Sequence, residues 1–89
     1  MKPVLVTTSH RGVFFGLLKE EDGNSVILER ARCAIRWNTS GGFLELAKDG
    51  PNSNSRIGDE ADAIKLFDVT SISHVTETAA AKWHAHENS

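Results

Sequence analysis

Residues 10–37 read HRGVFFGLLKEEDGNSVILERARCAIRW, and most of the predicted architecture follows from them. Two apolar runs, 13–18 and 26–28, flank the segment 21–24, which reads EDGN. An Asp-Gly pair supplies the positive backbone φ that a tight hairpin turn requires. We therefore predict a β-hairpin at this turn, followed by a third strand.

The first arm of this hairpin is apolar on both faces. The odd positions from 13 to 17 face one side of an extended chain, and Phe14 and Leu18 face the other. Such a strand is covered on both sides, either by its own domain or by a second subunit. Gly16 interrupts the run, and a glycine inside a strand marks a bulge, a sharp bend or a close approach of another backbone. We expect a bent strand with its corner at Gly16.

The segment 29–37 continues the hairpin. Its first part, 29–32, would also suit a helix, whereas 33–37 alternates in the manner of a strand. One face then carries Cys33, Ile35 and Trp37, and the other carries Arg32, Ala34 and Arg36. We predict a strand whose arginine face is exposed to solvent, leading into a turn at 38–42.

The remaining residues predict further short strands and one helix. Strands are expected at 4–8, 56–58, 63–67 and 69–75, a loop at 49–55, and a strand, or alternatively one helical turn, at 43–48. Residues 76–84 predict a helix that Thr76 caps and Trp83 holds against the body, and 84–89 a frayed tail. This order favours a mainly β fold, either a small SH3-like or Sm-like barrel or a strongly bent antiparallel sheet, with a short C-terminal helix.

Length and composition are those of a small soluble protein. The 89 residues are expected to form a single domain, 1–89, in which a second subunit would add useful burial. Hydrophobic residues make up 39 % and charged residues 25 %, and no apolar run approaches the roughly 20 residues of a membrane span. The start of the chain does not lead into a signal-peptide core, and the single Cys33 fits a reducing compartment. We therefore expect a cytoplasmic homo-oligomer without membrane contact.

The formal net charge of −2 hides an uneven distribution. Residues 1–56 contain eight Lys or Arg against six Asp or Glu, whereas residues 57–89 contain two against six. A general DNA-binding chain would be strongly basic, but a local anion pocket is compatible with this pattern.

The candidate ligand-binding residues lie in the basic part of the chain: Arg11, Arg32, Arg36, Trp37, Gly41, Gly42 and Arg56. Arginine forks bind phosphates through paired hydrogen bonds, an indole can stack on a base, and a glycine turn exposes backbone N–H groups. Together these residues predict a nucleotide or single-stranded nucleic-acid site. The alternative is that the arginines pair with Glu20, Glu21, Glu29 and Glu45 on a solvated face, with Trp37 in the core.

No catalytic or metal-binding signature stands in the sequence. The four histidines, His10, His74, His84 and His86, lack a suitably spaced set of partner ligands, so we expect no metal and no cofactor. The scattered Ser and Thr residues form no nucleophile-elbow pattern with a histidine. Cys33 is expected to be buried rather than reactive. We therefore predict that the protein is not an enzyme.

Several motifs are spread over almost the whole chain: Arg11-Gly12-Val13-Phe14-Phe15-Gly16, Ala31-Arg32, Trp37, Gly50-Pro51, Arg56-Ile57 and Trp83. In these motifs the chain resembles a family of small proteins of unknown function that phages and prophages encode. The resemblance implies a bacterial host cytoplasm and no particular chemistry.

These observations predict a non-enzymatic, oligomeric binding protein. Its ligand would be an anionic small molecule of the nucleotide type, held in a pocket between subunits. A counter-defence role, in which a nucleotide signal of bacterial defence is sequestered, follows from the phage setting alone. The alternative is an RNA-binding or host-protein-binding modulator of a bacterial enzyme that uses the same arginines or an exposed strand edge.

Overall fold

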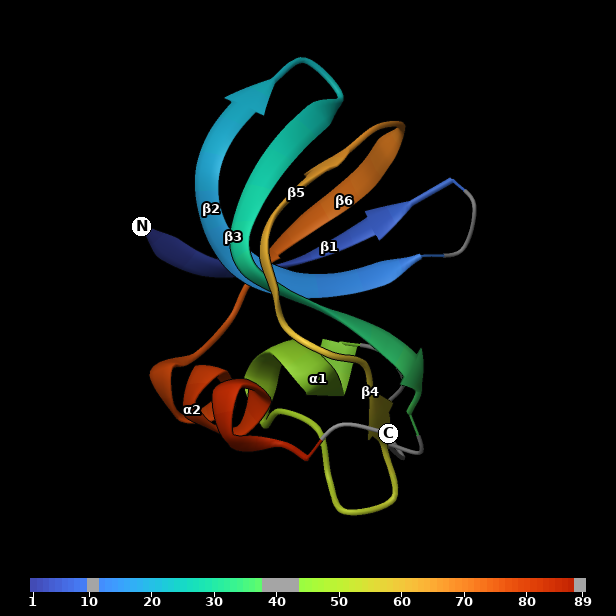
Figure 1. Ribbon diagram of the computed structural model, residues 1–89, viewed down its shortest axis with the longest axis vertical. Helices are drawn as coiled ribbons and strands as arrows, with labels where there is room; N and C mark the ends of the chain where they lie inside the picture. Colours follow the sequence, from blue (N-terminus) through green and yellow to red (C-terminus); the bar gives the residue numbers. More distant parts are fainter. Residues whose placement is uncertain (10–11, 38–43, 88–89) are drawn as a thin grey trace.

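The computed structural model describes residues 1–9, 12–37 and 44–87, and every structural statement below refers to these residues. In chain order the elements are β1 (Lys2–Thr8), β2 (Val13–Asp22), β3 (Ser25–Arg36), α1 (Leu44–Lys48), β4 (Arg56–Ile57), β5 (Ala61–Leu66), β6 (Val69–His74) and α2 (Glu77–Ala85). The fold is mainly β with a short C-terminal helix, as predicted. The long strands gather at one end of the molecule, and α1 and α2 lie beside each other at the other end (Figure 1).

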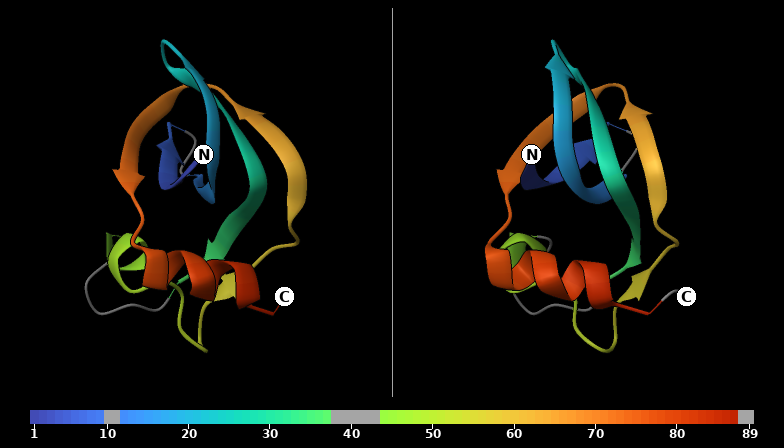
Figure 2. Two further views of the ribbon diagram at one scale, coloured as in Figure 1. Left: turned by 90° about the vertical axis from the view of Figure 1, so that its left-hand side faces the viewer. Right: turned by 60° about the vertical axis from the view of Figure 1, so that its left-hand side comes forward.

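The six strands form one antiparallel sheet in the order β4-β3-β2-β1-β6. β5 also pairs with β3, along residues 26–31, whereas β4 pairs with the end of β3 at residues 34–36. A link of two residues, 67–68, joins β5 to β6, and the two strands diverge from it along opposite sides of the molecule (Figure 2). The sheet is therefore strongly bent but not closed, which confirms the bent sheet rather than the barrel.

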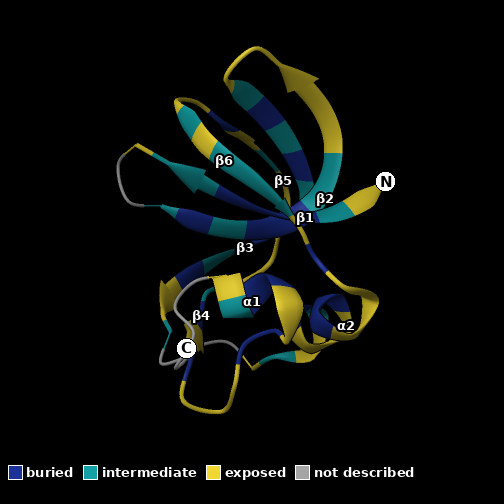
Figure 3. Ribbon diagram, turned by 180° about the vertical axis from the view of Figure 1, so that it is seen from behind, coloured by how far each residue is buried: buried dark blue, intermediate teal, exposed yellow. Residues whose placement is uncertain are grey.

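The predicted hairpin is confirmed. β2 ends at Asp22, β3 begins at Ser25, and Gly23 in the turn has a φ of 61°. The residues at the tip of the hairpin are exposed, whereas the deeper parts of both strands are buried (Figure 3). The two loop residues are therefore Gly23 and Asn24, and the positive φ of Gly23 at the first of them fixes the register of the two longest strands.

Gly16 is the corner of β2, as predicted. The register of β2 against β3 shifts between Phe15 and Leu17, on either side of the glycine. A Cβ atom on Gly16 would lie 2.7 Å from the Cβ of Leu28. Because real Cβ atoms do not approach so closely, only glycine lets β3 pass at this point.

Two apolar clusters lie on opposite faces of the sheet. The helix-side cluster consists of Leu5, Val13, Phe15, Ala34, Leu46, Ala47, Ile57, Val75, Ala79, Ala80 and Trp83, with Trp37 packed against it. The sheet-side cluster consists of Val4, Val6, Val26, Leu28, Ala31 and Leu66, with Phe14, Leu18, Ile64, Val69 and Ile72 packed against it. β2 contributes Phe15 to the first and Phe14 to the second, so its two faces are covered within its own domain.

The strand expected at 43–48 is wrong, because Leu44–Lys48 form α1. Gly50 has a φ of 84°, and a glycine in this left-handed conformation is a common way to end a helix. The indole Nε1 of Trp83 donates to the carbonyl oxygen of Leu46 at 3.0 Å. The helical turn is therefore fixed by a stop signal after it and by a tertiary contact, and both outweigh the local alternation.

The predicted C-terminal helix and its cap are confirmed. The Thr76 hydroxyl oxygen accepts a hydrogen bond from the backbone N–H of Ala79 at 3.0 Å, and the hydroxyl donates to the Lys48 carbonyl at 2.8 Å. Trp83 is fully buried and stacks on Phe15 with the ring centroids 5.1 Å apart. One hydroxyl thus joins the end of α1 to the start of α2.

The tail predicted to fray from residue 84 onward is attached to the body as far as the structure describes it. His84 lies within α2, and its ring packs edge-on against Phe15 at 5.0 Å. The Nε2 atom of His86 lies 3.0 Å from the carbonyl oxygen of Asn52.

Candidate functional site

The structure separates the seven predicted ligand-binding residues. Arg11, Gly41 and Gly42 lie outside the described residues, so that part of the prediction is untouched. The others fall in three settings: Arg32 is buried, Trp37 is half-buried against the helix-side cluster, and Arg36 and Arg56 are exposed.

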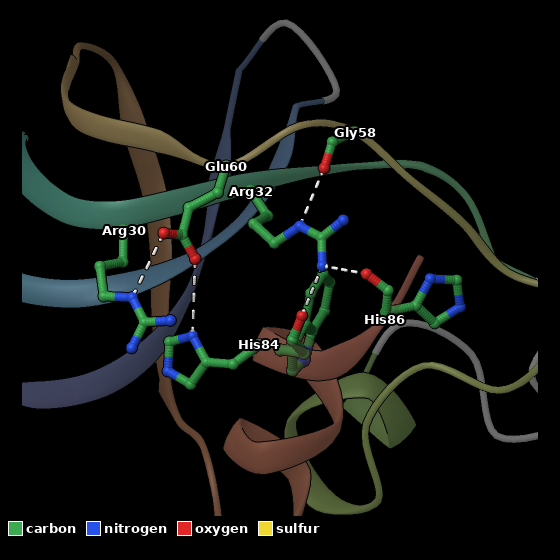
Figure 4. Close-up of polar contacts among 7 residues, drawn as sticks. Arg30, Arg32, Gly58, Glu60, His84 and His86 are labelled. Carbon is green, nitrogen blue, oxygen red and sulfur yellow. Dashed lines mark hydrogen bonds and ion pairs between the residues drawn. The ribbon is translucent and has the colours of Figure 1, made fainter. Parts of the chain in front are cut away.

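Arg32 is only 2 % exposed, and its guanidinium is occupied by backbone carbonyls (Figure 4). Its Nε donates to Gly58 at 2.9 Å, and its Nη1 donates to Trp83 at 2.7 Å and His86 at 2.6 Å. The last carbonyls of a helix lack partners within the helix, and a cation is favoured there. Arg32 therefore ties the end of α2 to β3, and its fork is not presented to a ligand.

This burial corrects the exposed arginine face predicted for 29–37. The alternation itself is present, because Arg32 lies opposite Phe15 of the helix-side cluster and the next residue, Cys33, lies opposite Phe14. The solvent assignment is wrong: Arg32 is buried, whereas Ile35 is 52 % exposed. The reason is that α2 covers this face and offers carbonyl acceptors, a tertiary partner that the local pattern does not contain.

A second polar group, formed by Arg30, Glu60 and His84, lies to one side of Arg32 and links β3 to α2 (Figure 4). Glu60 bridges Arg30 Nε, at 3.3 Å, and His84 Nδ1, at 3.9 Å. The second distance is too long for a hydrogen bond, and His84 Nδ1 is buried without a hydrogen-bond partner among the described residues. Burial, followed by the charge of Arg30, lowers the pKa of His84, and Glu60 opposes that change. The net shift favours the neutral form of the imidazole.

No candidate nucleophile in the described part of the chain is joined to His84 by a hydrogen bond. Among the described residues, the Nδ1 atom has no hydrogen-bond partner, and burial raises the pKa of the Cys33 thiol. Across the same residues, no three His, Cys, Asp or Glu side chains are grouped so that they could hold a metal ion. Sequence reasoning did not identify Glu60 as a partner of His84, and no local pattern marks the pair.

The two exposed arginines, Arg36 and Arg56, lie where the C-terminal end of β3 pairs with β4. The register of β3 and β4 places Arg36 opposite Arg56, although 19 residues of chain lie between them. Neither side chain makes an ion pair or a hydrogen bond with a described residue. Like charges directly opposite each other in a sheet are destabilising, and an anion between them would remove that cost. Of the predicted arginines that the structure describes, these two are brought together.

The pairing between Arg36 and Arg56 is irregular. The register shifts between Ala34 and Arg36, after the regular pair of Ala34 with Ile57. Both members of that pair are buried, whereas both arginines beyond it are exposed. The shift therefore allows the strand ends to present two cations to solvent directly beside a buried pair.

A shallow depression of about 50 Å³ lies elsewhere, between the hairpin tip and β5. Its lining residues are Glu20, Asp22, Ser25, Val26, Ile27 and Lys65. Two carboxylates face one ammonium group there, and nucleotide-sized ligands usually occupy several hundred Å³. The depression is therefore not suited to an anionic ligand.

Comparisons with known proteins place the chain in a family. No curated protein and no solved structure matches the chain. None of the described helices is long and apolar enough to cross a membrane. Residues 1–83 match the family model described as a domain of unknown function, DUF6948. Because this match extends over nearly the whole sequence, including β1 to β6 and most of α2, the chain belongs to the DUF6948 family.

Proposed function

We propose that this chain is a non-enzymatic binding protein that captures an anionic ligand of the nucleotide type at the Arg36–Arg56 pair. The observation that carries the proposal is the β3–β4 register, which sets two exposed arginine residues opposite each other, and neither side chain has a partner among the described residues. Two arginine forks side by side offer several N–H donors to one phosphate, and arginine is favoured for such bidentate contacts.

Trp37 supplies a second part of the proposed site. It follows Arg36 directly in the sequence and is half-buried, with one part of its indole packed on the helix-side cluster. A partly accessible ring that is fixed by packing can stack on a nucleobase at little cost in side-chain entropy. The pair of arginines would then hold the phosphate and Trp37 the base.

The proposed site differs from the one expected at the outset. Arg32 is excluded because its Nε donates to the carbonyl of Gly58 and its Nη1 donates to carbonyls at the end of α2. Arg11, Gly41 and Gly42 lie outside the described residues and remain predicted residues of the site. A role in counter-defence would follow if the phage setting implied by the resemblance holds, since sequestering a signal requires capture and no catalytic group.

The test is a calorimetric titration of the full chain with ATP, a cyclic dinucleotide and ADP-ribose. We expect saturable binding of at least one of them, and a loss of affinity of about tenfold or more in Arg36→Ala/Arg56→Ala, because hydrogen bonds to charged groups contribute about 1.5–3 kcal/mol each. Lys19→Ala/Lys65→Ala is the matched control, since it removes the same net charge from other exposed sites.

Three results would contradict the proposal. The first is equal weakening in the control pair, which would indicate a diffuse charge effect. The second is binding only to single-stranded RNA, with a steep dependence on salt, which would favour the RNA-binding alternative. The third is no binding to any of these ligands together with co-purification of a host enzyme, which would favour the host-protein modulator.

A further inference from the structure

The edge of β6 is an unpaired strand edge at one end of the sheet. β6 pairs with β1 on one side, and no described strand pairs with its other side. β5 has a similar edge, and the two diverge from residues 67–68 (Figure 2). An open edge presents unpaired N–H and C=O groups to any other extended chain.

The register of β6 against β1 shows which backbone groups face outward. The N–H of Val75 donates to the carbonyl of Pro3 at 3.2 Å, and His74 lies opposite Val4, so Val75 lies opposite Pro3 in the same register. Hydrogen-bonded and non-hydrogen-bonded pairs alternate along an antiparallel ladder. Ser73 and Ser71 therefore bond toward β1. The N–H and C=O groups of Ile72 and His74 point away from β1, toward the open edge.

The two open edges differ in the features that normally prevent pairing. β5 carries Asp62 and Lys65, and Glu60 directly precedes it. β6 reads VTSISH and contains no Asp, Glu, Lys, Arg or Pro. Its single irregularity is a bulge at Thr70, where β1 changes register from Ser71 to Val69. Because charges, prolines and bulges are the usual protection of edge strands, residues 71–74 form an unprotected segment.

The side chains of residues 71–74 favour pairing with the same segment of a second copy of the chain. Ile72 lies opposite Val6 of the sheet-side cluster, whereas Ser71 and Ser73 lie opposite residues on the other face. A two-fold axis through Ile72 would place Ile72 opposite the partner's Ile72 and Ser71 opposite the partner's Ser73. Apolar residues then meet on one face and hydroxyl groups on the other, as the pleat requires. A two-fold axis midway between Ser71 and Ile72 would place Ser71 opposite the partner's Ile72. These two residues lie on opposite faces of the sheet, so that register is incompatible with the pleat.

We propose that β6 pairs antiparallel with β6 of a second copy of this chain, with Ile72 on the two-fold axis. The outward N–H and C=O groups of Ile72 are then exchanged with those of the partner's Ile72, and two bent sheets become one continuous sheet. Such an isologous contact closes after two subunits. The contact is independent of the proposed anion site, which lies at the β3–β4 end of the sheet.

Cysteine cross-linking tests the register directly. In a Cys33→Ala background, Ile72→Cys should form a disulfide-linked dimer, because a hydrogen-bonded pair has a Cα separation of about 5.5 Å, inside the range for disulfides. Ser73→Cys alone should not cross-link to itself. A mixture of the Ser71→Cys and Ser73→Cys chains should cross-link to each other. Self-linking of Ser73→Cys at the same rate as Ile72→Cys would overturn the proposed register.

Sedimentation of the cysteine-free chain tests the dimer itself. We expect a dimer that His74→Pro converts to a monomer, because proline removes an outward N–H without breaking a bond to β1. His74→Ala is the matched control and should remain dimeric, and circular dichroism should show the same strand content for both variants. A monomeric parent chain with a native spectrum would overturn the proposal. Neither experiment uses the anion ligand, so the outcome is separate from that of the nucleotide titration.

Discussion

The two apolar clusters on either face of the sheet are closed in different ways. The helix-side cluster contains the two largest fully buried side chains, Trp83 and Phe15, and α1 and α2 cover it. The sheet-side cluster is mostly aliphatic, and five further members of it are only partly buried, because β5 and β6 do not meet. The sheet alone does not close, and α1 and α2 therefore complete the most deeply buried part of the core. On the side that the sheet leaves open, five members of the sheet-side cluster stay partly exposed.

Removing the central ring of the helix-side cluster should have the largest effect. Trp83→Ala is expected to lower the free energy of unfolding by about 3–5 kcal/mol, because it removes a buried ring and the donor to the Leu46 carbonyl. Ile64→Ala, at a partly buried position of the sheet-side cluster, is expected to cost less than half as much. Urea denaturation of both variants measures the difference. Equal losses would mean that the two clusters contribute alike.

Two arginines of β3 should also differ in their contribution to stability, because Arg32 is buried under α2 and Arg36 is exposed. Arg32→Met is expected to cost about 2–3 kcal/mol, because it leaves carbonyls at the end of α2 without their donor. Arg36→Met, four residues further along the strand, should stay within about 0.5 kcal/mol, as exposed substitutions usually do. The same denaturation experiment compares them. A large loss for Arg36→Met would contradict its assignment as a residue available to ligand.

Gly16 tests how tightly the sheet-side cluster is packed at its corner. Gly16→Ala is expected to destabilise the fold by about 1–3 kcal/mol, because the new methyl group would overlap Leu28. Combining it with Leu28→Gly should cost less than the sum of the two single changes, since the second change removes the Cβ atom that the new methyl group would overlap. Additive losses would show instead that backbone conformation, and not the close approach, requires the glycine.

The smallest expected effect concerns pH and His84. Burial lowers the pKa of His84 in the folded state below its ordinary value of 6.5, so the unfolded chain binds more protons near that pH. Stability should therefore be complete above the unfolded pKa and fall as the pH decreases through it. His84→Gln should flatten this slope, whereas His74→Gln, at an exposed position, should not. Thermal melts between pH 7.5 and pH 5 in steps of about half a unit resolve the slope. An identical slope in His84→Gln would exclude His84 as the cause.

Much of the fold could be predicted because its signals are local. The Gly23-Asn24 turn and the Thr76 cap each depend on residues that lie next to each other in the sequence, and the corner of β2 is marked by the single residue Gly16. The helical state of 44–48 could not be obtained in this way, because Leu-Glu-Leu alternates like a strand and its helical turn depends on Trp83.

The candidate site was harder to predict because it depends on tertiary partners. Arg32 and Arg36 occupy equivalent positions in the alternation, yet α2 ends over the first and not over the second. The pairing of Arg36 with Arg56 requires the register of β3 and β4, which no local pattern specifies. Charge alone predicted that all the arginines would be exposed to solvent. Arg32 is buried instead, because the carbonyl acceptors at the end of α2 accept its hydrogen bonds.

The carbonyls that hold Arg32 have a consequence for the order in which this domain can be built. Arg32 belongs to β3, but two of its acceptors, on Trp83 and His86, are synthesised more than fifty residues later. The edge of β1 that faces β6 also stays unpaired until β6 has been synthesised, although its other edge can pair with β2 early. During translation the guanidinium therefore lacks two of its carbonyl acceptors until the end of α2 has left the ribosome. The domain then matures in one late step, and a stop codon shortly before residue 83 would damage its centre rather than its margin.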